Sequence, residues 1–311
     1  MIAYIGVDAG GTHTEAGVAG PDLTPITRYR GPSGRLDPMI EDVASPIVAA
    51  VREACEQASV PLPATAAVIG AAGAGTASLG DRLRDALLLA GIADRVAVRT
   101  DLDVAFHAAF GDAAGMLISA GTGSVAAARD TGGRSFRVGG YGWRVGDDGS
   151  AASLGRAAVQ AALRAEDRRG EVTTLLGCLR EQSGTGDTLG RAAWLRAAGP
   201  GDFARLVPVV VQAAQDGDAV AERLVADIVD ALVAHVTALR VVTEDRAGTT
   251  VALNGGLLAN ASTIRARFVD HLTRSHPDLT VTEDPVDPVR GALALAQRLA
   301  ENVGDRDGWM G

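Results

Sequence analysis

Two short glycine-rich segments, each between apolar stretches, have the residue types best suited to bind a phosphate anion. The first is GVDAGGTHT at residues 6–14, and the second is SAGTGS at residues 119–124. Glycine lets the backbone approach a ligand closely, and exposed N–H groups and hydroxyls can donate hydrogen bonds to an anion. Each segment alone also fits an ordinary hairpin turn. Together they predict one phosphate cradle in each half of the chain.

The first segment is expected to form a hairpin tip rather than the start of a helix. Its glycines are adjacent, unlike the Gly-x-Gly-x-x-Gly spacing of dinucleotide-binding turns, and the following residues alternate as in a strand. The candidate phosphate-binding residues are Gly10, Gly11, Thr12 and Thr14 in this tip and Gly121, Thr122 and Gly123 in the second. Asp8 is a candidate ligand, through water, for a Mg²⁺ ion that neutralises the phosphates.

Asp101, in RTDLDVAF, is a candidate general base. It follows a predicted strand and opens a predicted helix, whose dipole favours an ionised carboxylate. Such a group can take the proton from an attacking hydroxyl. Two alternatives stay open: Asp101 is a plain N-cap, or Asp103, inside the first turn, is the base.

Two further segments can bind small molecules. In GGYGWRVGDDGSAASLGRAA, residues 139–158, Asp147 follows Gly146 and lies near two aromatic residues in the sequence, a typical way to hold sugar hydroxyls. In VALNGG, a predicted strand leads to Gly255 and Gly256, where the backbone can lie against a nucleoside. Each segment also fits a glycine-rich loop without a ligand.

Composition narrows the functional classes. The 311 residues allow two domains, the net charge is −9, and all 29 basic residues are arginine. Without lysine, the Walker A loop, the protein-kinase fold and Schiff-base chemistry are excluded. The acidic balance argues against nucleic acid and membrane as partners. Cys55 and Cys178 are too few for a disulfide framework, and no signal peptide or membrane span is evident, so a cytoplasmic protein is expected.

Alternating strand and helix patterns predict an α/β fold. The strand, turn, strand pattern at residues 2–19 recurs from residue 115, which indicates an internal duplication. Further strands are expected at 66–70, 96–99 and 249–253, and a loop at 21–36. Helices are expected at 46–58 after Ser45, at 78–90 with Ser78 as N-cap, and at 101–111, 151–168, 188–198, 202–214, 218–242, 262–274 and 288–301. The tail from 301 is expected to be frayed.

With these segments in order, the chain resembles the BadF/BadG/BcrA/BcrD-type ATPase family and, within it, the N-acetylglucosamine kinases of the actin, Hsp70 and sugar-kinase superfamily. The resemblance spans nearly the whole chain and includes DPVRGALALA near the C-terminus. It implies two ribonuclease-H-like (actin-like ATPase) domains with a central cleft. The expected domains are 1–114 plus 287–303, with a returning C-terminal helix, and 115–286.

The resemblance also implies an ATP- and Mg²⁺-dependent kinase acting on the 6-hydroxyl of an amino sugar. N-acetylglucosamine is the first expected sugar and glucosamine the second, with glucose and N-acetylmuramate open. By this likeness Asp101 is the base, Asp8 anchors hydrated Mg²⁺, the two turns hold phosphates, and Gly255 and Gly256 line the nucleoside. Sugar contacts fall on Ser33, Gly73, Tyr141 and Asp147. A homodimer is compatible with the likeness.

Two departures from the family pattern concern the sugar side. Gly34 stands near the position of a sugar-contacting asparagine, and Tyr141 stands where tryptophan is frequent. Reaction type is therefore predicted more firmly than the sugar.

Two other functional classes share parts of this pattern. An ATP-driven activator of acyl-CoA dehydratases or benzoyl-CoA reductases would hold an iron–sulfur cluster through two cysteines per subunit. The spacing of Cys55 and Cys178 disfavours it, as neither lies near SAGTGS. A sugar-sensing regulator would carry a helix-turn-helix before the kinase fold, whereas this sequence starts at the first predicted strand.

Overall fold

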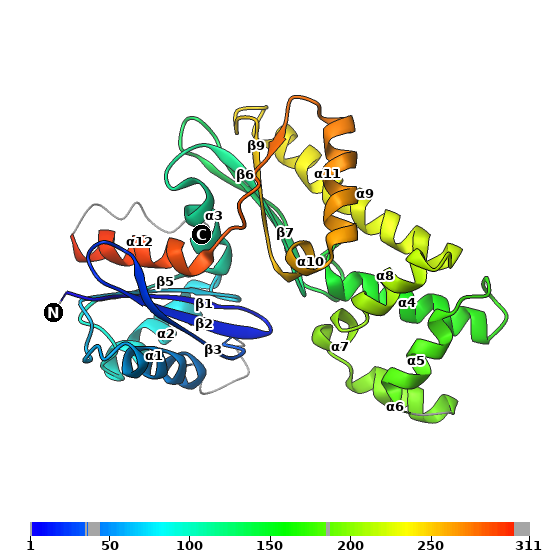
Figure 1. The fold of residues 1–311 in the computed structure, drawn as a ribbon, viewed down its shortest axis with the longest axis horizontal. Coiled ribbons are helices and arrows are strands. Elements are labelled where there is room, and N and C mark those ends of the chain that lie inside the picture. Colours follow the sequence, from blue (N-terminus) through cyan, green and yellow to red (C-terminus); the bar gives the residue numbers. More distant parts are fainter. Residues whose placement is uncertain (1, 35, 37–43, 185–186, 302–311) are drawn as a thin grey trace. The chain divides into compact units, whose positions relative to one another are not determined.

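The computed structural model describes residues 2–34, 36, 44–184 and 187–301. The chain divides into two compact units, here called unit 1, Met1–Ala113 with Val286–Gly311, and unit 2, Ala114–Pro285. Each unit is built on one five-stranded sheet with helices packed against it (Figure 1). The expected frayed tail lies largely outside the described residues.

Unit 1 contains the sheet order β3-β2-β1-β4-β5. Its strands are β1 (Tyr4–Ala9), β2 (His13–Ala19), β3 (Pro25–Pro32), β4 (Ala66–Ala71) and β5 (Val96–Thr100), and its helices are α1 (Ser45–Gln57), α2 (Ala77–Leu89), α3 (Asp101–Phe110) and α12 (Pro288–Ala300). The first three strands pair antiparallel, whereas β1, β4 and β5 run parallel. The carboxyl ends of the parallel strands therefore meet at one edge of the sheet, which is where ligands bind in open α/β sheets.

Helices cover both faces of this sheet. α1 and α2 pack on the face formed by residues such as Ile5 and Val7, whereas α3 and α12 pack on the face that includes Val68 (Figure 1). α12 lies close to β1 because Gly6 has no side chain: a β-carbon there would lie 2.6 Å from the carbonyl oxygen of Val289. The last helix is thus an integral part of the first unit's core.

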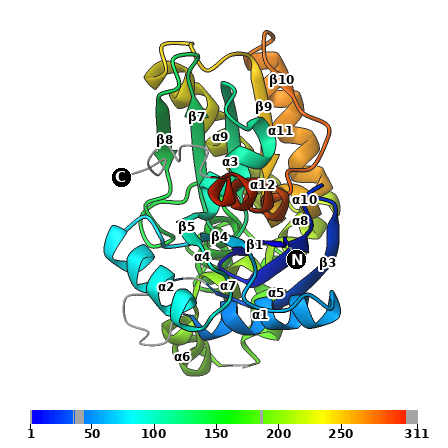
Figure 2. The ribbon, with the colours of Figure 1, turned by 90° about the vertical axis from the view of Figure 1, so that its left-hand side faces the viewer.

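Unit 2 contains the sheet order β10-β9-β6-β7-β8. Its strands are β6 (Gly115–Ala120), β7 (Ser124–Arg129), β8 (Ser135–Gly139), β9 (Thr250–Asn254) and β10 (Thr280–Val281), and its helices are α4 (Ala151–Glu166), α5 (Leu175–Ser183), α6 (Thr188–Ala197), α7 (Pro200–Ala204), α8 (Val207–Gln215), α9 (Ala219–Val242), α10 (Gly256–Asn260) and α11 (Ser262–Ser275). β8 and β7 lie at one side of the sheet and β9 and β10 at the other (Figure 2).

The two sheets have the same connectivity. In each, three consecutive antiparallel strands are followed by two strands that extend the sheet in parallel on the other side of the first strand. The internal duplication that the two glycine turns suggested is thus present in the folded units.

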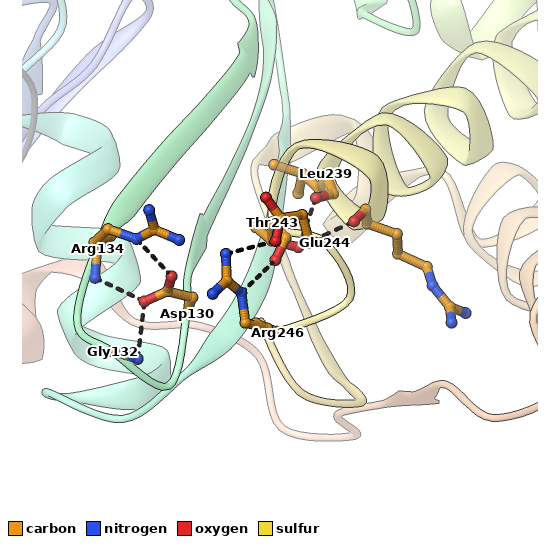
Figure 3. Close-up of polar contacts among 8 residues, drawn as sticks. Asp130, Gly132, Arg134, Leu239, Thr243, Glu244 and Arg246 are labelled. Atoms are coloured by element: carbon orange, nitrogen blue, oxygen red, sulfur yellow. Dashed lines mark hydrogen bonds and ion pairs between the residues drawn. The ribbon is translucent and has the colours of Figure 1, made fainter.

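The β7–β8 connection closes the end of the second sheet that lies away from the β6–β7 turn. The Asp130 carboxylate accepts hydrogen bonds from the amides of Gly132 and Arg134, both at 2.9 Å, and from Arg134 Nε at 2.9 Å (Figure 3). The amide of Thr131 donates to the carbonyl of Arg246 at 3.0 Å, which ties the turn to the segment after α9.

Some expected elements were wrong. Residues 25–32, expected within a loop because of their prolines, form β3; proline is tolerated at the end of an edge strand, and the residues between alternate in exposure. The 202–214 helix is two helices, α7 and α8, and β8, β10, α5 and α10 were missed. The N-caps of α1 and α2 are Ala44 and Thr76, which lie one and two residues before the expected Ser45 and Ser78. Among the described residues, none of the helices combines the length and apolar character needed to cross a membrane.

Candidate active site

The β1–β2 hairpin places the first glycine turn at the carboxyl end of β1. Ala9 pairs with Thr14, and the amide of Gly10 donates to the carbonyl of His13 at 3.0 Å, so residues 10–13 form the tip. Gly11 and Thr12 are exposed there. The hairpin predicted from the sequence is therefore present, with its glycines at the surface.

Thr14 lies below this tip rather than on its surface. Its side chain is fully buried, and within the described residues its hydroxyl has no hydrogen-bond partner. In strand β2 it shares a face with Ala16, because side chains alternate along a strand. The expectation that Thr14 donates directly to phosphate is not met by this arrangement.

Thr14 also explains why Gly34 stands near the position at which the family has a sugar-contacting asparagine. A β-carbon on Gly34 would lie 2.6 Å from Thr14 Oγ1, 3.0 Å from Ile47 Cγ1 and 3.1 Å from Ala9 Cβ. Position 34 therefore has no room for asparagine unless its neighbours move.

Two predicted sugar-side residues lie near the same edge of the sheet. Ser33 Oγ donates to the carbonyl of Gly10 at 3.0 Å, so its hydroxyl contacts the hairpin tip. Gly73 has φ +92°, and a β-carbon there would lie 2.6 Å from the carbonyl oxygen of Leu36. Ser33 thus contacts the hairpin tip, and Leu36 packs against the segment that follows β4.

Asp8 and Asp101 influence each other electrostatically within unit 1. Partial burial raises the pKa of Asp8 to about 7, and the negative charges of Asp101, Glu15 and Asp287 add to the effect. Glu15 faces Asp8 across the β1–β2 pair, and Arg28 forms ion pairs with Glu15 and Asp287. Neither Glu15 nor Asp287 is among the site residues predicted from the sequence. Glu15 could have been found from the antiparallel register of the hairpin, which places it opposite Asp8.

The start of α3 separates the roles of its two aspartates. Thr100 is the N-cap: its Oγ1 accepts from the amide of Asp103 at 3.1 Å, and the Asp103 carboxylate accepts from the amide of Thr100 at 3.0 Å. Asp101 is the first helical residue, and its carboxylate accepts from the amide of Leu102 at 3.0 Å. Asp103 is thus part of a capping box, and Asp101 is not the cap.

The second glycine turn, between β6 and β7, is held by the start of α4. The amide of Ala151 donates to the carbonyl of Gly121 at 2.9 Å, and that of Ala152 to the carbonyl of Thr122 at 3.2 Å. Ser124 Oγ donates to the carbonyl of Asp148 at 2.7 Å, so this hydroxyl fixes the following loop.

Asp147 lies against the second turn. It has φ +58°, its Oδ1 accepts from the amide of Gly142 at 3.0 Å, and its Oδ2 lies 2.8 Å from where a β-carbon on Gly123 would be. Asp147 and the exposed Tyr141 also line an open pocket of about 570 Å³ bounded by α4 and α9, with Arg156 among its walls.

The glycines after β9 lie beside the same turn. Gly255 has φ +95°, and a β-carbon there would lie 2.4 Å from the carbonyl oxygen of Ala120. A β-carbon on Gly121 would lie 3.5 Å from the amide nitrogen of Gly256. The loop that carries Asp147, the start of α4 and the glycines after β9 therefore all lie against residues 121–123.

The chain is similar to known proteins along nearly its whole length. The model of the BadF/BadG/BcrA/BcrD ATPase family matches residues 5–296. The chain belongs to this family. The resemblance inferred from the motifs is confirmed, and membership implies the use of ATP.

Curated relatives and solved structures extend along the whole chain. The chain is 26% identical over 96% of its length to the N-acetylmuramic acid/N-acetylglucosamine kinase of Clostridium acetobutylicum, covering 99% of that protein. It is 24% identical over 94% of its length to the N-acetyl-D-glucosamine kinase of Dictyostelium discoideum, covering 97% of it. The structure of a candidate N-acetylglucosamine kinase from Chromobacterium violaceum is 28% identical, with TM-score 0.82, over 95% of this chain and 99% of that one.

This structural similarity, together with the two matching sheets, confirms the predicted fold class. Among the described residues there is no group of three or more His, Cys, Asp or Glu side chains arranged to hold a metal ion. The sequence predicts a metal contact through Asp8 alone, by way of water.

Proposed function

We propose that this protein is an ATP-dependent kinase that phosphorylates the 6-hydroxyl of an amino sugar. Its curated relatives over nearly the whole chain bear the names of N-acetylglucosamine kinases, which supports this class of enzyme. The observation that carries the proposal is the proximity of Asp8 and Asp101, sufficient for the Asp101 charge to raise the pKa of Asp8, next to a glycine hairpin tip.

In the proposed reaction, Asp101 accepts the proton of the sugar hydroxyl as that oxygen attacks the γ-phosphorus of ATP. A carboxylate at the first position of a helix is favoured in its ionised form by the helix dipole, as a general base requires. The N–H groups of residues 11–12 and 122–123 are proposed to bind phosphate oxygens. The amides of Gly10 and Gly121 donate within their own turns, and these two glycines are proposed to let the backbone approach the phosphates closely. Phosphoryl transfer needs mainly such positioning and neutralisation of charge.

Asp8 is proposed to hold a hydrated Mg²⁺ ion that travels with ATP. The residues fit this role, because a partly buried carboxylate next to other carboxylates is stabilised in its ionised form by a cation. The ion would supply charge neutralisation on the phosphates.

Asp147 and Tyr141 of unit 2 are proposed to contact the sugar, and Ser33 and Gly73 of unit 1 are proposed as further sugar contacts. Gly255 and Gly256 are proposed to line the nucleoside. N-acetylglucosamine is the first expected sugar and glucosamine the second. Position 34 is a glycine because Thr14 leaves no room for a side chain there, so the family's sugar-contacting asparagine has no counterpart. Any substrate panel should therefore also include N-acetylmuramate and glucose.

The direct test is ADP release from MgATP across N-acetylglucosamine, glucosamine, N-acetylmuramate and glucose, followed by mass spectrometry of the product. We expect the highest kcat/KM with N-acetylglucosamine, and phosphate on O6. Absence of sugar-dependent ADP release with the entire panel would refute the proposal. Asp147→Ala should raise the sugar KM far more than the ATP KM.

The alternative, an iron–sulfur activator, has less support. Cys55 is buried in α1 of unit 1, and Cys178 is half-buried in α5 of unit 2, where its environment raises its pKa. Burial raises the pKa of Cys55 to about 11, which disfavours the thiolate that iron binding needs. Stoichiometric iron in anaerobically purified protein would favour the alternative.

A further inference from the structure

The loop between β8 and α4 carries Asp147 on a tight turn. Gly142 has φ +96° and Asp147 φ +58°, so left-handed residues stand at both ends of a six-residue segment, 142–147. A left-handed conformation is unfavourable for a residue with a side chain, and it persists only where surrounding contacts enforce it. Three sets of contacts hold this turn.

The first set is internal. The amide of Gly146 donates to the carbonyl of Gly142 at 2.8 Å, and the Asp147 carboxylate accepts from the amide of Gly142 at 3.0 Å. These bonds close the turn on itself and use one oxygen of Asp147.

The second set is an aromatic anchor. The half-buried Trp143 packs against Phe203, with ring centroids 6.0 Å apart, and the Arg144 guanidinium lies 5.6 Å from the centre of the indole. By contrast, Tyr141 and Val145 are 83% and 87% exposed. The aromatic contact therefore fixes the Trp143 side chain, whereas the backbone of the turn is held by other contacts.

The third set comes from α4. Arg156 Nη1 donates to the carbonyl of Trp143 at 2.8 Å and to that of Arg144 at 3.0 Å. One nitrogen thus joins two consecutive carbonyls, which requires both to face the same helix. A charged donor makes such bonds stronger than a neutral one would, and the guanidinium keeps this donor charged at any physiological pH.

We infer that Arg156 is a positioning residue for sugar binding: its guanidinium holds the 142–147 turn so that Asp147 faces the second glycine turn. The inference rests on the proposed function. Arg156 itself is not assigned a contact with the reacting atoms. It acts by fixing the backbone from which Asp147 projects, and a misplacement of about 1 Å can change rates a hundredfold.

The test compares Arg156→Gln with Arg156→Lys and with Arg164→Gln, a control at an exposed arginine on the same helix. We expect Arg156→Gln to raise the sugar KM about tenfold or more and to leave the ATP KM within about twofold of wild type. Lysine keeps the charge and one donor group, so Arg156→Lys should recover part of the loss. The control should match wild type in both constants.

A second readout is independent of turnover. Hydrogen exchange at the amides of Gly142 and Gly146 should be faster in Arg156→Gln than in wild type, with thermal stability and the exchange of β6 unchanged. Unchanged exchange at both amides, or a parallel rise in sugar and ATP KM, would overturn the inference. If wild type phosphorylates no sugar, the proposed function fails by itself, and the exchange comparison still decides whether Arg156 holds the turn.

Discussion

Asp147 occupies space that Gly123 leaves free. Its Oδ2 lies 2.8 Å from where a β-carbon on Gly123 would stand, while its Oδ1 is held by the amide of Gly142. The residue proposed to bind the sugar and the turn proposed to bind phosphate are therefore in direct steric contact, and a change in one should affect the ligand of the other.

Gly123→Ala tests this contact. The added methyl group would displace the Asp147 carboxylate, so we expect the sugar KM to rise about tenfold, with a smaller effect on the ATP KM. Steady-state kinetics with each substrate varied in turn measures both constants. Gly132→Ala, in the β7–β8 turn, serves as a control away from the site. An ATP KM that rises more than the sugar KM would contradict the steric account.

Asp101→Asn should abolish phosphoryl transfer while nucleotide binding survives. Removal of a general base lowers the rate by roughly 10²–10⁴-fold, and asparagine keeps the shape of the side chain. Asp103→Asn is the matched comparison: it weakens the capping box, which costs about 1 kcal/mol of stability, and should leave kcat close to wild type. Kinetics and nucleotide titration measure both. If Asp101→Asn retains turnover and Asp103→Asn loses it, the assignments must be exchanged.

Asp8→Asn should make the protein inactive and more stable at neutral and alkaline pH. Because the pKa of Asp8 is raised from 3.8 to about 7, ionisation costs the folded state more than the unfolded one. Wild type therefore loses stability as pH rises from about 4 to 7, by at most about 4 kcal/mol at about 1.4 kcal/mol per pKa unit. Asparagine removes that dependence.

Thermal unfolding between pH 4 and pH 8 without divalent ions measures the effect. The stability advantage of Asp8→Asn should be greatest at pH 8 and disappear near pH 4. Asp94→Asn, an exposed substitution in the same unit, controls for the loss of one charge. An advantage that is independent of pH would show that burial of a charged carboxylate is not its source.

Asp130→Asn should destabilise unit 2, and the loss should shrink in acid. Hydrogen bonds from the amide of Arg134, then from the Arg134 side chain and the amide of Gly132, lower the pKa of Asp130 (Figure 3). Its stabilisation is present above the unfolded-state pKa and declines as pH falls through the lower folded-state pKa. Melting curves at pH 7 and pH 3 give the comparison. An equal loss at both values would indicate that hydrogen-bond geometry, rather than charge, is responsible.

The sequence allowed the two-unit architecture and most helices to be predicted, because glycine turns and apolar periodicity are local signals. β3 was missed because its prolines resemble loop residues, although they stand at the ends of an edge strand. Thr14 was assigned to phosphate from its residue type, although it alternates with the polar His13 and Glu15 and shares a strand face with the apolar Ala16. Glu15 could have been placed opposite Asp8 by the hairpin register.

Arg156 had no signal in the sequence. Its partners are two backbone carbonyls 12 and 13 residues earlier. Every residue has a backbone carbonyl, so the residue types at these positions do not reveal the contact. Asp287 likewise comes beside Asp8 only because the chain returns to unit 1 after the whole of unit 2. Such long-range neighbours depend on tertiary packing.

The seat of α12 against Gly6 has a consequence for biosynthesis. A ribosome makes the strands of unit 1 first, but the helix that covers β1 emerges only after every residue of unit 2. Until α12 is made, the face of the unit 1 sheet that it covers stays exposed, so unit 2 is the part that can reach its native state first. A chain that ends before Pro288 would expose this apolar face permanently and would bind chaperones instead of forming a smaller enzyme.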